Sequence, residues 1–204
     1  MEYDKDINDN ILRIYICGPH STGKTTLLND LRPYLNNIKV AEELARGIIK
    51  AHGWSRDDFH PVKHPDIFKQ LNEEILDAQV KVDDECTKLG EDFISDRAID
   101  PIVYIGFYID DRDKNSLYEH PGVKTWLLRL KQSLIFLIYP HQECLEDDNV
   151  RLTPTLAELI RFHDSFEKEL QMHDIPYIKV TELDRQSRVT RVLDEIKLFK
   201  LRRG

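Results

Sequence analysis

The sequence predicts an α/β fold in which a mostly parallel sheet of about five strands lies between two layers of helices. Short apolar runs alternate along the chain with longer segments whose apolar residues recur at helical spacing. The runs are apolar throughout, as strands buried on both faces are. Because parallel strands need crossover connections, this alternation is typical of a three-layer arrangement with helices on both faces of the sheet.

The expected strands share a short length and a high content of Ile, Leu, Val and Phe. The run SLIFLIY at 133–139 is the clearest of them and stops at a proline, and ILRIYIC at 11–17 stops at a glycine. Proline and glycine commonly end regular structure. The strands are expected at 11–17, 37–41, 92–95 (reaching Asp96), 133–139 and 177–181.

The expected helices each have one apolar face. In the first of them, Leu27, Leu28 and Leu31 share a side, and the long helix 66–89 repeats the same spacing over six turns or more. The charged segment 110–115 (DDRDKN) has no such face and is expected to be a turn. The helices are expected at 24–35, 42–52, 66–89, 100–108, 122–131, 153–172 and 185–201.

A glycine-rich segment follows the first strand directly. Residues 18–25 are Gly-Pro-His-Ser-Thr-Gly-Lys-Thr, the pattern G-x-x-x-x-G-K-[ST] in the strand-to-helix context that it requires. The glycines let successive backbone N–H groups face a polyphosphate, the lysine adds positive charge, and the last threonine offers a hydroxyl to Mg²⁺. The motif therefore predicts a P-loop NTPase fold that binds Mg²⁺ with ATP, or alternatively GTP. The residues expected at the nucleotide are Gly18, Pro19, His20, Ser21, Thr22, Gly23, Lys24, Thr25 and Thr26.

The composition limits the compartment and the partners. The 204 residues carry 37 acidic and 29 basic side chains, a net charge of −8, which disfavours broad binding to nucleic acid. Three sparse cysteines fit a reducing compartment, so a cytoplasmic location is expected. The longest apolar run, Leu134–Tyr139, is far shorter than the roughly 20 residues that span a bilayer. We expect a flexible lead-in at 1–10 and one domain at 11–204, with a lid around 141–165.

Two absences indicate which kind of nucleotide protein this is. The chain has no N-K-x-D string to recognise guanine, and the strand that ends in Asp96-Arg97 has no following glutamate to activate water. An acceptor other than water is therefore favoured, and phosphoryl transfer to a small molecule becomes the leading hypothesis. Contacts to the donor base are expected around 183–188.

Three further segments resemble a known family. EDFISDRAIDPIVY (91–104) is similar to the strand ending in Asp-Arg of thymidylate-kinase-like and other nucleoside and nucleotide kinases. VAEELAR (40–46) resembles the Glu-x-x-Arg of the NadR-like P-loop family, which includes a ribosylnicotinamide kinase domain, and DDNVR (147–151) resembles its late Asp-Asp-Gly-x-Arg, with Asn149 where glycine is usual. The resemblance runs from residue 11 to about residue 196 in the expected order, and it implies the same three-layer fold and an ATP-dependent kinase.

The carboxylates at matching positions are candidate catalytic residues. Asp96 stands at the carboxyl end of a parallel strand, where open α/β sheets bind ligands, and it could hold Mg²⁺ through water or accept the acceptor's proton. The alternative for Asp96 is an ordinary acid at a helix N-terminus. Glu43 is the other candidate base or substrate contact. The alternative is a solvated ion pair between Glu43 and Arg46 on one helix.

Three arginines are candidates for binding phosphate or carboxylate groups. Arg46 could bind such a group in bidentate fashion, and Arg97 could neutralise a phosphate or merely brace Asp96. Arg151 would suit a mobile lid that reaches the transferring phosphoryl group and excludes water, the alternative being a surface arginine. With Lys24, Asp96 and Glu43, Arg151 completes the set of predicted catalytic residues.

The sequence thus predicts ATP-dependent phosphoryl transfer to a small hydroxyl-bearing metabolite, such as a nucleoside, nucleotide or ribosylnicotinamide-like compound. One alternative is a nucleotide-dependent switch with a protein or phosphoinositide partner, in which the basic terminus 197–203 would contact membrane anions. The other is a kinase acting on a polynucleotide end, which the acidic balance disfavours.

Overall fold

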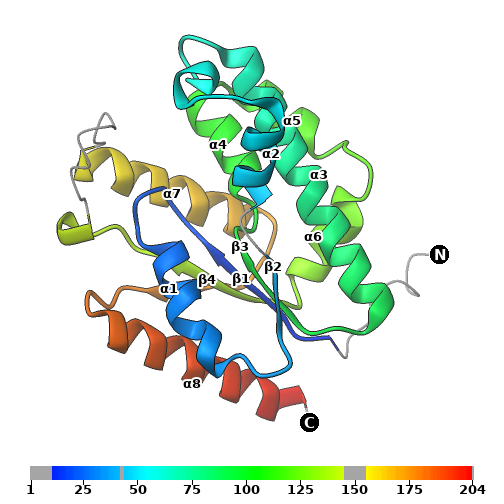
Figure 1. Ribbon diagram of the computed structural model, residues 1–204, viewed down its shortest axis with the longest axis vertical. Coiled ribbons are helices and arrows are strands. Elements are labelled where there is room, and N and C mark those ends of the chain that lie inside the picture. The colour runs from blue at the N-terminus through cyan, green and yellow to red at the C-terminus, as the bar shows by residue number, and fades with distance from the viewer. Residues whose placement is uncertain (1–10, 42–43, 145–154, 204) are drawn as a thin grey trace.

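The computed structural model describes residues 11–41, 44–144 and 155–203. Its five described strands form a parallel sheet, as the apolar runs predict (Figure 1). The strands are β1 (Arg13–Cys17), β2 (Lys39–Ala41), β3 (Phe93–Asp96), β4 (Leu134–Ile138) and β5 (Ile178–Val180). Their order in the sheet is β2-β3-β1-β4-β5, so β1 lies at the centre between β3 and β4.

The helices connect these strands and cover both faces of the sheet (Figure 1). The α-helices are α1 (Lys24–Leu31), α2 (Leu44–His52), α3 (Pro65–Leu89), α4 (Asp100–Tyr108), α5 (Asp111–Leu117), α6 (Val123–Leu130), α7 (Leu156–Met172) and α8 (Arg185–Arg203). Three short 3₁₀ turns are η1 (Arg32–Tyr34), η2 (Arg56–Phe59) and η3 (Gln142–Cys144). Among the described residues, no helix combines the length and the apolar character needed to cross a membrane.

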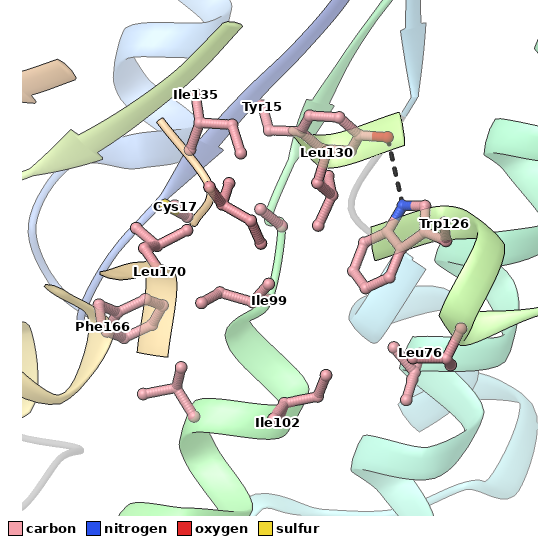
Figure 2. Packing of buried hydrophobic residues seen from close by; sticks show 14 of the residues in the cluster. Tyr15, Cys17, Leu76, Ile99, Ile102, Trp126, Leu130, Ile135, Phe166 and Leu170 are labelled. Atoms are coloured by element: carbon pink, nitrogen blue, oxygen red, sulfur yellow. Dashed lines mark hydrogen bonds between the residues drawn. The ribbon is translucent and has the colours of Figure 1, made fainter. Parts of the chain in front are cut away.

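Alternate residues of each strand point to opposite faces, and each face has its own core. On one face, Ile14 and Ile16 of β1 pack with the leucines of α1 and with Val189, Val192 and Ile196 of α8. On the other, Tyr15 and Cys17 pack with α3, α4, α6 and α7. Figure 2 shows Trp126 of α6 directed at Tyr15, to whose hydroxyl its indole N–H donates a 3.3 Å hydrogen bond. The central strands β1, β3 and β4 are buried at every residue, as expected for a sheet covered on both faces, which confirms the three-layer fold.

The prediction of a turn at 110–115 is wrong. Residues 111–117 form α5, and the Asp110 carboxylate caps it by accepting a 2.7 Å hydrogen bond from the Asp113 N–H. Acidic residues in the first turn also complement the helix dipole, so the charges that indicated a turn stabilise the helix start. Lys114 then pairs with Asp111 at 3.0 Å and with Glu169 of α7 at 3.1 Å. The expected helix 24–35 likewise ends at Leu31, where η1 begins with Pro33 in its first turn.

The strand order places two sequence motifs side by side. Ile16, near the end of β1, is the register partner of Asp96 at the end of β3. The loop after β1 and the Asp-Arg pair of β3 therefore leave the sheet at the same carboxyl edge. In open parallel sheets this edge is where ligands bind.

Candidate active site

The loop at 18–23 connects β1 to α1 through an unusual backbone path. Gly18 has φ +134° and Gly23 has φ +85°, and a Cβ on Gly18 would lie 2.9 Å from the carbonyl oxygen of Ile138. A side chain at position 18 would therefore clash with the end of β4 in a conformation that L-residues avoid. Thr22 is buried and donates a 2.9 Å hydrogen bond from its hydroxyl to the Pro19 carbonyl, which fixes the loop internally.

Lys24 lies across this loop and is almost fully buried. Its ammonium donates hydrogen bonds to the carbonyl oxygens of Gly18 at 2.9 Å and Pro19 at 2.8 Å. Burial lowers the pKa of Lys24, while the nearby carboxylates of Asp100 and Asp96 act in the opposite sense. A positive charge is thus held at the mouth of the loop, beside the N-terminus of α1, where an anion is electrostatically favoured.

Thr25 and Asp96 face each other across the sheet edge. The Thr25 hydroxyl donates a 2.8 Å hydrogen bond to Oδ2 of Asp96, and the other carboxylate oxygen, Oδ1, is buried without a hydrogen-bond partner. Buried carboxylate oxygens are normally satisfied, so Oδ1 is available to a ligand. A hydroxyl and a carboxylate are the hard oxygen donors that Mg²⁺ prefers together with water and phosphate, so these two residues fit the ion.

Beside Asp96 lies a cluster of buried polar groups in which sequence reasoning identified Arg97 but missed Asp100. Asp100, the first residue of α4, is fully buried, and its Oδ2 accepts a 2.8 Å hydrogen bond from the Ala98 N–H. Burial raises the pKa of Asp100, against the opposing effect of Lys24 and Arg97. Arg97 has φ +121° and stacks its guanidinium 5.7 Å from the centre of the Tyr104 ring. An acid placed four residues after the strand-end aspartate, at a helix start, was the available signal.

A cavity of about 650 Å³ opens beside Thr25 and Asp96. It lies between α1 and α2, and Arg46, exposed on α2, is among its lining residues, whereas Arg97 is not. Glu43 and Arg151 lie outside the described residues. The lining of this cavity therefore brings together three of the predicted site residues: Thr25, Asp96 and Arg46. The lining residues are Thr25, Leu28, Asn29, Arg32, Leu44, Arg46, Gly47, Ile48, Lys50, Ala78 and Asp96.

Two further predicted nucleotide-binding residues, Thr26 and His20, differ in their exposure to solvent. Thr26 is exposed on the first turn of α1. His20 is half-buried, and its ring lies 6.3 Å from that of Tyr104 and 5.9 Å from that of Phe162. The histidine at this variable position of the motif therefore contacts the aromatic residues of α4 and α7.

Arg188 of α8 is hydrogen-bonded to the loop. Its guanidinium donates a 2.9 Å hydrogen bond from Nη1 to the Thr22 carbonyl and a 2.6 Å hydrogen bond from Nε to the Glu182 carbonyl. A Cβ on Gly23 would lie 3.1 Å from Nη1, so the absence of a side chain there lets the two groups approach. Arg188 lies in the segment 183–188, but nothing in its sequence context indicated a contact to the loop.

The fold and this loop define a P-loop nucleotide-binding protein. Its family follows from the sequence: the family model described as an AAA domain matches residues 13–188, and the chain belongs to that family. The match, together with the likeness to the fold of NadR, confirms the resemblance to NadR-like P-loop proteins. No curated protein sequence matches the chain significantly.

Solved structures share the fold at low sequence identity. NadR in complex with NR has a TM-score of 0.70 at 20% identity over 95% of this chain and 53% of its own, so this chain spans about half the length of that protein. Deoxyadenosine kinase from M. mycoides with dCMP and dCDP bound has a TM-score of 0.65 at 14% identity, over 91% of this chain and 99% of its own. Shikimate kinase from Aquifex aeolicus has a TM-score of 0.52 at 18% identity, over 91% of this chain and 96% of its own. At these identities the likeness establishes the fold.

Proposed function

We propose that this protein is a P-loop kinase that transfers the γ-phosphoryl group of ATP to a hydroxyl group of a small metabolite. The acceptor would be a nucleoside, a nucleotide or a ribosylnicotinamide-like compound. The observation that carries the proposal is the 650 Å³ cavity beside Thr25 and Asp96, within the range of about 300–1,000 Å³ that small-molecule sites occupy. Fold neighbours named as deoxyadenosine kinase and shikimate kinase, and NadR with NR bound, support the same reaction class.

The phosphate loop would bind the donor. Backbone N–H groups of 18–25 and the ammonium of Lys24 would contact the phosphates, and Thr25 and Asp96 would hold Mg²⁺. When bound, Mg²⁺ neutralises charge on the β- and γ-phosphate oxygens. Because phosphoryl transfer depends on positioning and charge neutralisation, a rigid loop with one buried cation is suited to it.

In the transfer step, the acceptor oxygen forms a bond to the γ-phosphorus while the bond from that phosphorus to the β,γ-bridging oxygen breaks. ADP leaves with that bridging oxygen, and the hydroxyl proton passes to a carboxylate and then to water. We assign the proton to Glu43, because the next residue, Leu44, lines the cavity and because Asp96 is directed at Thr25. Arg46 would bind an anionic group of the acceptor, and Arg97 and Arg151 would neutralise the transferring phosphoryl group.

The proposal is tested by measuring ADP formation by the purified chain with Mg²⁺·ATP and a panel of acceptors. The panel contains nucleosides, nucleoside monophosphates, ribosylnicotinamide and shikimate. We expect one class of acceptor to raise ADP formation well above the rate with water alone and to yield the phosphorylated acceptor by mass spectrometry. ADP formation that no acceptor accelerates would overturn the proposal.

Substitution of the buried lysine supplies a second test. Lys24→Met removes the cation at the loop mouth and should lower kcat by about 10²-fold or more, the usual cost of losing one preorganised electrostatic contact. Lys88→Met is the matched control, because Lys88 is exposed near the end of α3. Equal activity of the two variants would contradict the role given to Lys24.

A nucleotide-dependent switch is the second candidate function. One observation favours it: α8 begins beside the phosphate loop, through Arg188, and ends with the exposed basic residues Lys197, Lys200 and Arg202. Under this alternative, nucleotide would alter binding of vesicles containing phosphoinositide. Reversing these three charges to glutamate would abolish vesicle binding in a switch and leave ADP formation unchanged in a kinase.

A further inference from the structure

His163 of α7 is buried without hydrogen-bond partners. Its side chain is 1% exposed, and neither Nδ1 nor Nε2 has a hydrogen-bond partner. Its ring packs edge-on against Tyr139 at 5.1 Å between centres. Buried polar groups are nearly always bonded, and an unsatisfied one calls for a ligand, water or ion. His163 lies outside the site described above, so the proposed kinase reaction does not account for it.

Two carboxylates of the same helix turn lie near one of these nitrogens. Nδ1 of His163 is 3.9 Å from Oδ1 of Asp164 and 3.9 Å from Oε2 of Glu167. These separations are too long for direct hydrogen bonds. All three atoms lie within 4.8 Å of one another. An ion with bonds of about 2.0–2.2 Å joins ligand atoms at most about 4.4 Å apart, so binding would draw these three atoms slightly closer together.

The Glu167 carboxylate is held in place from its other side. Its Oε1 accepts a 2.7 Å hydrogen bond from the Tyr177 hydroxyl and pairs with Lys179 at 2.6 Å. The Tyr177 hydroxyl in turn accepts a 3.0 Å hydrogen bond from Gln171. This leaves Oε2 directed toward His163. Metal-binding carboxylates are typically oriented by such outer contacts, and Lys179 is the cation that faces the cluster.

The environment of the cluster also suits an ion. The Asp164 side chain is 66% exposed, so one of the three ligands lies at the protein surface. One imidazole with two carboxylates favours a transition metal such as Zn²⁺, whereas Mg²⁺ prefers oxygen ligands alone.

We propose that His163, Asp164 and Glu167 form a binding site for a divalent transition-metal ion of the Zn²⁺ class, separate from the Mg²⁺ position at Thr25 and Asp96. The three side chains supply one nitrogen and two oxygen ligands, and water completes the coordination. The ion would give Nδ1 of the buried imidazole a partner and would link it to the two carboxylates of α7. This inference does not depend on the kinase reaction.

The experiment is a calorimetric titration of the full-length, tag-free, metal-stripped protein with zinc chloride. The background is Cys144→Ser, because a thiol also binds zinc. We expect one Zn²⁺ per chain, with an affinity that falls at least tenfold in Asp164→Asn and in Glu167→Gln. Asp66→Asn, which alters a 94% exposed aspartate of α3, is the matched control and should bind as the parent does.

Circular dichroism establishes that each variant is folded. Because Asp164 is exposed, Asp164→Asn should fold as the parent does, so its effect on zinc binding can be measured. Co²⁺ in place of Zn²⁺ should give a visible absorption band that His163→Asn removes. Absence of zinc binding, or binding that Asp164→Asn and Glu167→Gln leave unchanged, would overturn the proposal.

Discussion

At the residue scale, the candidate active site balances opposite charges inside a small buried volume. The Lys24 ammonium is bonded to the carbonyls of Gly18 and Pro19, and the carboxylates of Asp96 and Asp100 counter the effect of burial on its pKa. Asp96 also binds Thr25 and retains one buried oxygen without a partner. Burying these charges costs free energy when no ligand is bound. The arrangement is therefore suited to binding a metal–nucleotide complex, which supplies charges of both signs.

The buried carboxyl of Asp100 gives a prediction about pH. Its pKa is raised in the folded protein, so between the unfolded and folded pKa values the folded state holds more protons than the unfolded state. The free energy of unfolding therefore falls as pH rises through this window, by at most about 1.4 kcal/mol per pH unit for one proton. Asp100→Asn keeps an oxygen acceptor for the Ala98 N–H but does not titrate.

We expect the stability of Asp100→Asn, measured by urea denaturation from acidic to neutral pH, to improve relative to the parent as pH rises. The exposed variant Asp66→Asn should follow the parent curve. Parallel curves for the parent and Asp100→Asn would show that Asp100 titrates normally and would contradict the prediction.

The same residues show how far a motif identifies a site. Thr25 and Asp96 were predictable because each stands at a fixed place: one in the phosphate-loop pattern, the other at the end of an apolar strand. Asp100 and Arg188 were missed because their importance comes from burial and from contacts between distant segments. The position of Asp100, four residues after Asp96 at a helix start, was a signal in the sequence, but its burial and the contacts of Arg188 appear only in the fold. For Glu43 and Arg151 the roles stay predictions.

At the element scale, α8 determines the position of the phosphate loop. Arg188, in the first turn of α8, joins the Thr22 carbonyl of the loop to the Glu182 carbonyl that follows β5. The side chain is 5% exposed, so these hydrogen bonds form away from competing water. The loop is thereby held by a helix at its back as well as by its own turns.

We predict that Arg188→Gln raises the KM for ATP by about tenfold while kcat changes by less than about threefold, because a loosened loop loses binding that is equal in ground and transition states. Arg191→Gln is the control, since Arg191 lies on the same helix and pairs with Glu195 at 3.1 Å near the surface. A fall in kcat without a change in KM would contradict a positioning role for Arg188.

Helix prediction failed where local chemistry outweighed the apolar pattern. Helix α5 was missed because its charged residues resemble those of a turn. In the structure Asp110 caps the helix, and Lys114 forms ion pairs with Asp111 and Glu169. The end of α1 was placed too late because Leu31 to Leu35 continues the apolar spacing through a 3₁₀ turn that contains Pro33. The central strands were easier, since burial on both faces leaves short runs that are apolar almost throughout.

At the scale of the whole molecule, a buried ionic cluster ties the sheet to two helices. Asp83 of α3 accepts a 2.7 Å hydrogen bond from the Tyr15 hydroxyl of β1 and pairs with Arg129 of α6 at 2.5 Å. Arg13 of β1 pairs with the same carboxylate at 3.3 Å. These groups are almost fully buried, so one carboxylate compensates two cations from different layers.

We predict that Asp83→Ala lowers the free energy of unfolding by about 3–5 kcal/mol, because it removes the buried carboxylate that Arg13 and Arg129 share. Asp84→Ala, which removes the half-exposed second partner of Arg129, should cost less than about 1 kcal/mol. Urea denaturation of both variants measures the difference. A loss below about 1 kcal/mol for Asp83→Ala as well would show that the buried cluster contributes little to holding the layers together.

The three-layer fold was predictable as a whole, because alternating apolar strands and amphipathic helices leave few other arrangements. The cavity was not predictable, since it depends on how α1 and α2 pack above the sheet edge. The proposed reaction rests on both: the motif would provide the donor site, and the cavity would provide room for an acceptor.

Phosphorus NMR of the protein with Mg²⁺·ATP and each acceptor of the panel tests this account most directly. It distinguishes a new phosphate ester from inorganic phosphate in one spectrum. The account predicts that one acceptor yields an ester signal equal in amount to the ADP formed. Release of inorganic phosphate alone, at the same rate with and without every acceptor, would contradict it.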